Sequence, residues 1–164
     1  MAKNVKQHRK VGEDYLRKAK TPGAVHRFPF PPEVVWAALL DGPAWSEWVD
    51  GITGVDWTSP KPFGIGTTRT VHLKGGQRVE EFFFAWDEGR RMAFYFDRST
   101  LPIKAAVEDY RVRSAPGGSE LIWSGRASGF PLGPIVSGAL GSGIRKGLPE
   151  LEALIARNPA RFGG

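Results

Sequence analysis

The sequence predicts an α+β domain in which a curved antiparallel sheet of about seven strands wraps around a long C-terminal helix. Three observations predict this fold. Six strand-like segments follow one another between residues 52 and 128, separated by turn-forming residues. Two short helical patterns lie between the first strand and these six, and one long helical pattern closes the chain. Since strands and helices do not alternate, we expect no doubly wound parallel sheet.

The length and composition indicate one domain with a sizeable core. The chain has 164 residues, of which 41% are apolar. The absence of cysteine excludes a disulfide framework, a thiolate nucleophile and a thiolate metal site, and it favours a reducing compartment. No apolar run approaches the ~20 residues of a membrane-spanning helix, and residues 1–20 lack the hydrophobic centre of a signal peptide. We therefore expect a cytoplasmic protein.

Positive charge is concentrated at the start of the chain. The formal net charge is +6, and residues 1–20 hold seven Lys or Arg against two acidic residues, a net of +5. The rest carries sixteen basic and fifteen acidic residues, a net of +1. Nucleic acid is not an expected partner, because a nucleic-acid-binding domain would carry its cations on the folded body. Residues 1–23 are predicted to be a basic extension, either a short helix over residues 11–20 or a disordered, solvated segment. Weak contact of residues 1–20 with a membrane surface or an acidic partner is the alternative.

Proline marks the first elements. Residues 25–30 alternate apolar and polar positions before Pro31-Pro32 and are predicted as the first strand. The proline pair opens a helix that should end near Asp41, and residues 43–48 are predicted as a second short helix. The six later strands are expected at residues 52–57, 67–73, 77–86, 91–97, 104–114 and 120–128.

The C-terminal helix is rich in glycine in its first half. Its apolar residues recur at helical steps at Ile144, Leu148, Leu151 and Ile155. Helix stability is lowered, by up to ~1 kcal/mol each relative to alanine, at Gly138, Gly141, Gly143 and Gly147. Either the helix packs closely or begins with a partly non-helical lead-in, or a thin helix leaves room for a bound molecule. We expect the ligand-binding domain to cover residues 24–158 and residues 159–164 to form a flexible tail.

Short motifs spread over residues 24–157 resemble one family. They include Val35-Trp36 with Asp41, Trp45 and Trp48; the run from Gly64 to Arg69; Glu81 with the run from Ala85 to Arg91; and Tyr110, Val112, Leu121, Trp123, Gly147, Leu148 and Leu151. In this order they resemble the helix-grip (START/Bet v 1-like, SRPBCC) superfamily, in its polyketide cyclase/dehydrase-like branch. The chain departs from the pattern at Glu88-Gly89, where members often have prolines. The resemblance implies a deep cavity between the sheet and the last helix for lipids, quinones or polyketides, and it does not by itself imply catalysis.

One predicted hairpin places two charged residues on the cavity side. If Lys74-Gly75-Gly76 is a three-residue loop, Val71 pairs with Val79 and Arg69 pairs with Glu81. A two-residue loop would shift this register. A buried cation and carboxylate are costly to desolvate unless paired, so Arg69 and Glu81 are candidates for orienting an oxygen of the ligand. The alternative is a purely structural ion pair.

A second polar pair follows from alternation along residues 104–114, where Glu108 and Tyr110 should point inward. In an enzyme they would supply an acid/base carboxylate and a phenolic donor, and otherwise Glu108 simply bonds to a neighbour. The remaining candidates for ligand contact are apolar, and core packing explains them equally well: Trp36, Val71, Phe83, Met92, Phe94, Phe96, Trp123 and Ile144.

The sequence offers no metal or cofactor motif. Its three histidines lie far apart without a carboxylate cluster, its glycine runs do not join a strand to a helix, and it has no serine nucleophile elbow. We therefore expect no cofactor and no metal. The first hypothesis is a carrier that sequesters or transports a hydrophobic small molecule. A cyclase/dehydratase-type enzyme that uses the same cavity is the alternative, and a regulatory or membrane-surface role for the basic extension is a third.

Overall fold

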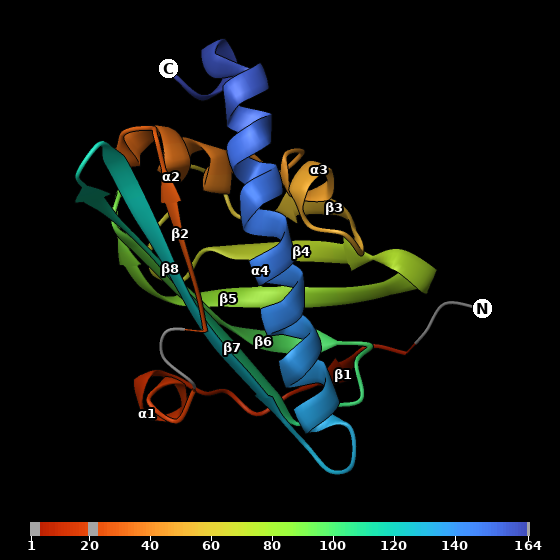
Figure 1. The fold of residues 1–164 in the computed structure, drawn as a ribbon. Helices are drawn as coiled ribbons and strands as arrows, with labels where there is room; N and C mark the ends of the chain where they lie inside the picture. The colour runs from red at the N-terminus through yellow and green to blue at the C-terminus, as the bar shows by residue number, and fades with distance from the viewer. Residues whose placement is uncertain (1–3, 20–22, 164) are drawn as a thin grey trace.

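An antiparallel sheet curved around one long helix forms the body of the structure, a computed structural model that describes residues 4–19 and 23–163 (Figure 1). The main sheet runs in the order β2-β8-β7-β6-β5-β4-β3. Its strands are β2 (Ala24–Phe28), β3 (Ile52–Trp57), β4 (Thr68–Leu73), β5 (Gln77–Asp87), β6 (Arg91–Ser99), β7 (Ala105–Ala115) and β8 (Gly118–Ser128). The helices are α1 (Glu13–Leu16), α2 (Pro32–Leu40), α3 (Trp45–Trp48) and α4 (Gly133–Arg157), with short 3₁₀ turns at η1 (Lys74–Gly76) and η2 (Pro159–Phe162). The predicted α+β class, the order of strands and helices along the chain and the long C-terminal helix are confirmed.

Helix α4 lies across the face of the sheet, with its C-terminal half between α2 and α3 (Figure 1). It packs against β8 and β2 and against α3. Its C-terminal half supplies the core with Leu148, Leu151, Leu154 and Ile155, each at most 2% exposed. The C-terminal half of α4 is therefore part of the core, while its first half faces β4, β5 and β6 across a cavity.

The register of the β4–β5 hairpin matches the prediction. Arg69 lies opposite Glu81, Val71 opposite Val79, and Leu73 opposite Gln77. The connection is the three-residue turn η1, in which Gly75 and Gly76 have φ angles of 76° and 73°. Glycine takes this left-handed conformation without a steric cost, which fixes the loop length and hence the register.

The described part of the basic extension, residues 4–19, is folded onto the sheet. Strand β1 (Lys6–Gln7) pairs with β6, and α1 is a single turn, shorter than the helix expected over residues 11–20. The side chains of Tyr15 and Leu16 pack with Ala105 and Val107 of β7. The Tyr15 hydroxyl donates to the Ser128 Oγ at 2.6 Å. The alternative of a disordered, solvated segment is therefore wrong for these residues, because Tyr15 and Leu16 cover the outer face of β7. Residues 20–22 lie outside the described part.

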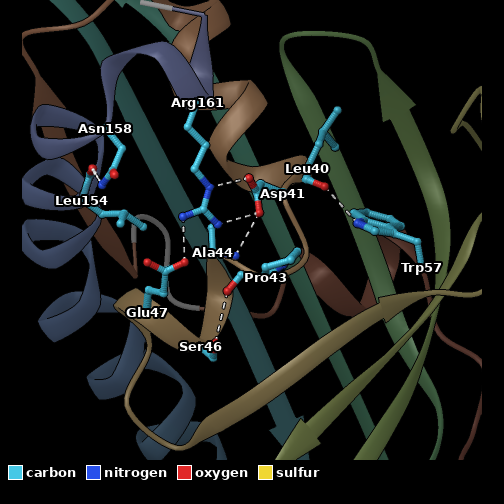
Figure 2. A network of polar contacts seen from close by, with 10 residues as sticks. All are labelled: Leu40, Asp41, Pro43, Ala44, Ser46, Glu47, Trp57, Leu154, Asn158 and Arg161. Atoms are coloured by element: carbon cyan, nitrogen blue, oxygen red, sulfur yellow. Dashed lines mark hydrogen bonds and ion pairs between the residues drawn. The ribbon is translucent and has the colours of Figure 1, made fainter.

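The expected flexible tail, residues 159–164, is also ordered through Phe162. The ring of Phe162 is 2% exposed and joins the core. Figure 2 shows the Arg161 guanidinium donating to both carboxylate oxygens of Asp41, at 2.9 and 3.0 Å, and to Glu47 Oε1 at 2.7 Å. These contacts fasten the end of α4 to the segment that joins α2 and α3, so the folded domain continues past residue 158.

Candidate functional site

A cavity of about 390 Å³ lies between the face of β4 to β7 and the first half of α4. Helix α3 contributes Trp45 to its wall. The sequence-predicted residues that line it are Arg69, Val71, Glu81, Phe96, Glu108, Tyr110 and Ile144. Alternation along β4, β5 and β7 thus brings two polar pairs from separate hairpins to one wall.

The other predicted lining residues lie in the core around the cavity and do not border it. They are Trp36, Phe83, Met92, Phe94 and Trp123, each at most 4% exposed. Trp36 donates to Glu88 Oε1 at 2.9 Å, and Trp123, which lies opposite Tyr110 on β8, donates to Glu108 Oε2 at 2.8 Å. An inward position on a strand is therefore not sufficient to border the cavity, because neighbouring rings cover these side chains.

On the wall that α4 contributes, sequence reasoning named only Ile144, although the glycine run signalled that more of the helix faces open space. The rest of this wall comes from Ile135, Val136, Ala139, Leu140 and Gly143. A Cβ atom added at Gly143 would meet nothing within 4 Å, whereas one at Gly147 would come within 2.7 Å of the Trp48 carbonyl oxygen. Close packing thus accounts for Gly147, whereas Gly143 faces open space; whether a molecule occupies that space stays a prediction. The partly non-helical lead-in is wrong, since α4 is helical from Gly133.

Arg69 and Glu81 form a buried ion pair, with side chains 1% and 4% exposed. The Arg69 Nε donates to Glu81 Oε2. The guanidinium carbon lies 4.6, 4.8, 5.2 and 5.3 Å from the ring centroids of Trp45, Phe94, Trp57 and Phe83. Aromatic faces attract a desolvated cation, so these rings compensate part of the hydration that Arg69 loses. Among the described residues, its buried Nη1 has no hydrogen-bond partner.

Glu108 is the second buried carboxyl group. Its Oε2 accepts hydrogen bonds from the Tyr110 hydroxyl and from the Trp123 indole N–H, each at 2.8 Å. Burial raises the pKa of Glu108 above its ordinary value, against the opposite effect of these two donors. Burial also raises the pKa of the Tyr110 phenol, and Glu108 adds to that rise.

Another titratable group of the wall is the Glu81 carboxyl group, whose pKa lies near neutral pH. Burial raises the pKa of Glu81 to about 7, with Arg69 opposing the rise and Glu108 adding to it. The cavity wall thus holds one buried cation and two carboxyl groups that burial favours in the neutral form. Such an arrangement can orient a ligand oxygen or hold a proton at a defined atom.

A model of one protein family, described as polyketide cyclase/dehydrase and lipid transport, matches residues 24–156. The chain belongs to this family. Curated proteins similar to this chain include uncharacterized proteins of Mycobacterium tuberculosis (Rv2574) and Mycobacterium bovis (Mb2604). Each is 48% identical over 94 residues, which are 57% of this chain. The chain spans 56% of the length of these relatives.

Solved structures share the fold of this family member at low sequence identity. XoxI from Bacillus cereus has a TM-score of 0.66 at 15% identity and covers 80% of this chain and 92% of its own. TTHA0849 from Thermus thermophilus has a TM-score of 0.66 at 16% identity, over 82% and 95% of the two chains. Ara h 8.0201 has a TM-score of 0.65 at 18% identity, again over 82% and 95%. At 15–18% identity these structures show a shared fold.

The cavity opens between the η1 turn and the start of α4. Its lining there includes Ile135, which is 66% exposed, and the exposed ion pair of Lys74 with Asp50. A separate groove of about 670 Å³ lies on the other side of α4, against β8, and Gly138 lines it.

Two kinds of feature are absent from residues 4–19 and 23–163, the part of the chain that the structure describes. In that part of the chain no three His, Asp or Glu side chains gather as metal ligands would. None of the helices found there is both long and apolar enough to cross a membrane.

Proposed function

We propose that this protein binds a small hydrophobic molecule, such as a lipid, a quinone or a polyketide-like compound, inside the cavity for sequestration or transport. The observation that carries the proposal is the cavity of about 390 Å³, which remains open although the surrounding core is closely packed. Its volume falls in the range of about 300–1,000 Å³ that is usual for small-molecule sites. Family membership supports the same role.

The cavity volume bounds the size of the guest. At ~30 Å³ for each water-sized unit, 390 Å³ accommodates about a dozen non-hydrogen atoms. Burial of apolar surface contributes ~25 cal/mol per Å², so an acyl chain or a fused ring of this size gains affinity from the aliphatic wall. The polar groups at Arg69, Glu81, Glu108 and Tyr110 would then fix the orientation of a ligand oxygen.

Two measurements test the proposal. Native mass spectrometry of protein purified from its own host should show a copurified apolar molecule, and an empty protein would count against carriage. Calorimetry with decan-1-ol should show binding that Gly143→Phe abolishes, because the new ring would fill the cavity. The matched control is Gly138→Phe, whose ring would enter the groove on the other side of α4 and leave the affinity unchanged. Equal affinity in both variants would place the ligand outside the cavity.

A cyclase/dehydratase-type enzyme is the second candidate, and the Glu108 pair favours it. A neutral carboxyl group hydrogen-bonded to Tyr110 in a water-poor wall can protonate a leaving hydroxyl group, while Glu81 accepts the proton from the adjacent carbon. Dehydration of a β-hydroxyketone, followed by enone absorbance, tests this candidate. Loss of turnover in both Glu108→Gln and Tyr110→Phe, with the fold intact, would support it, and unchanged turnover would remove these residues from any mechanism.

The role of the basic extension stays a prediction. Its cations at Lys6, Arg9, Lys10 and Lys18 are exposed on the folded segment, so a membrane surface or an acidic partner can still reach them. Deleting residues 1–20 and measuring association with anionic liposomes tests this role, which fails if association is unaltered.

A further inference from the structure

The charges of the cavity wall indicate which polar group its ligand carries. Among the described residues that line the cavity, Arg69 is the one buried cation, since Lys74 at the mouth is 67% exposed. A fully buried charge must be paired, and Glu81 is the carboxyl group that pairs with it. The wall therefore stabilises one anion beside Arg69.

The hydrogen-bonding capacity of this wall is incompletely used. The Arg69 Nη1 is buried without a partner in the described part of the chain. The hydrogen bonds to Glu81 and to Glu108 each end on Oε2. A guanidinium group prefers to bind a carboxylate through two parallel N–H donors, and Glu81 occupies only the Nε donor.

Building on the proposed function, we propose that the ligand is an apolar molecule that ends in a carboxylate, which pairs with Arg69 while Glu81 takes up one proton from solvent. Charge is conserved in this exchange. The ligand carboxylate and one proton enter, Glu81 becomes a neutral carboxylic acid, and the net charge of the wall does not change. The ligand chain then occupies the apolar part of the cavity.

The surroundings of Glu81 support this exchange. Its pKa of about 7 means that at neutral pH the proton costs little to bind. The charged or titratable groups around it are Arg69 on β4, Glu108 and Tyr110 on β7, Lys74 and Asp50 at the mouth, and Glu80 and Asp97 on the outer side. The α3 and α4 residues that line the cavity carry no titratable group. An amine would place a second cation beside Arg69, and an alcohol would leave the charge of Glu81 unchanged.

Calorimetry on the full chain tests the proposal with three probes of equal chain length: sodium decanoate, decan-1-ol and decylamine. Decanoate should bind most tightly at about pH 6, and its affinity should fall by about tenfold per pH unit above about pH 7. In two buffers with different ionisation enthalpies, uptake of about one proton should appear at about pH 8. Decan-1-ol should bind with an affinity that does not depend on pH.

Variants separate this idea from its alternatives. Glu81→Gln cannot take up the proton and should bind decanoate with no pH dependence, whereas Glu80→Gln, on the opposite face of β5, should keep the wild-type profile. If no probe binds, the proposed function fails. If decan-1-ol or decylamine binds as tightly as decanoate at about pH 6, or if decanoate binds without proton uptake, the carboxylate assignment is wrong and the proposed function stands. Proton uptake on decanoate binding is measured with the wild-type protein. The conclusion therefore does not depend on whether a variant at Arg69 folds.

Discussion

Two glycines of α4 should respond to alanine in opposite directions. Alanine stabilises a helix interior by up to ~1 kcal/mol relative to glycine. At Gly143 the new methyl group meets nothing within 4 Å, so Gly143→Ala should stabilise the fold by about 0.5–1 kcal/mol. At Gly147 the methyl group would lie 2.7 Å from the Trp48 carbonyl oxygen and 2.9 Å from its ring. Overpacking costs about 1–3 kcal/mol, and so short a contact with a backbone oxygen belongs to the upper part of that range, about 2–3 kcal/mol. After a helix gain of up to ~1 kcal/mol, Gly147→Ala should therefore destabilise the fold by about 1–2 kcal/mol.

Urea unfolding and thermal melting of the two variants measure this difference. For a chain of this size, 1 kcal/mol shifts Tm by about 2–4 °C, so Gly143→Ala should raise Tm by about 1–4 °C and Gly147→Ala should lower it by about 2–8 °C. Gly138→Ala, which also meets open space, should behave like Gly143→Ala. Shifts of the same sign at Gly143 and Gly147 would refute the view that one side of α4 faces a void and the other packs on α3.

Three further perturbations test other parts of the account. Because burial raises the pKa of Glu81 to about 7 from its ordinary 4.5, the folded state keeps a proton that the unfolded state releases between these values. Stability should therefore fall as pH rises from 4.5 to about 7, and Glu81→Gln should make that slope shallower in unfolding measured across pH, with Glu108 contributing the remainder; an unchanged slope would contradict the assignment to Glu81. Phe162→Ala should cost about 3–5 kcal/mol in urea unfolding, since the ring is core, while Arg161→Ala, whose side chain is 30% exposed, should cost about 1 kcal/mol; equal losses would contradict this difference. Tyr15→Phe should cost about 1 kcal/mol by removing the hydrogen bond to Ser128, and it should speed proteolysis of the N-terminal segment; unchanged proteolysis would mean that the segment is held elsewhere.

The sheet could be predicted because its signals are local. The two glycines of η1 set the loop length, the loop length sets the register of Arg69 and Glu81, and alternation with a period of two puts Glu108 and Tyr110 on the same side. None of these steps needs knowledge of the helix that covers the face.

The border of the cavity could not be predicted, because it depends on where α4 and α3 lie. Phe83 and Phe94 point inward as expected, yet they surround the Arg69 guanidinium and do not line the void. Conversely, Val107 points outward and is still buried, because α1 packs on it. Placement of α1 and α4 results from packing between segments far apart in sequence, which periodicity does not report.

The ordered ends of the chain were missed for a similar reason. Phe162 has no periodic neighbours, and Arg161 finds its partners Asp41 and Glu47 more than a hundred residues away. A single aromatic residue after a helix gives no local signal of burial.

The central claim is that a guest molecule occupies the space between β4, β5 and α4. Intermolecular nuclear Overhauser effects, measured with methyl-labelled protein and the tightest-binding of the three ten-carbon probes, test it most directly. We predict contacts from the probe chain to the methyl groups of Val71, Leu101 and Ile144, which line the cavity. Contacts to Ala127 in the groove on the other side of α4, with none to these three residues, would contradict it.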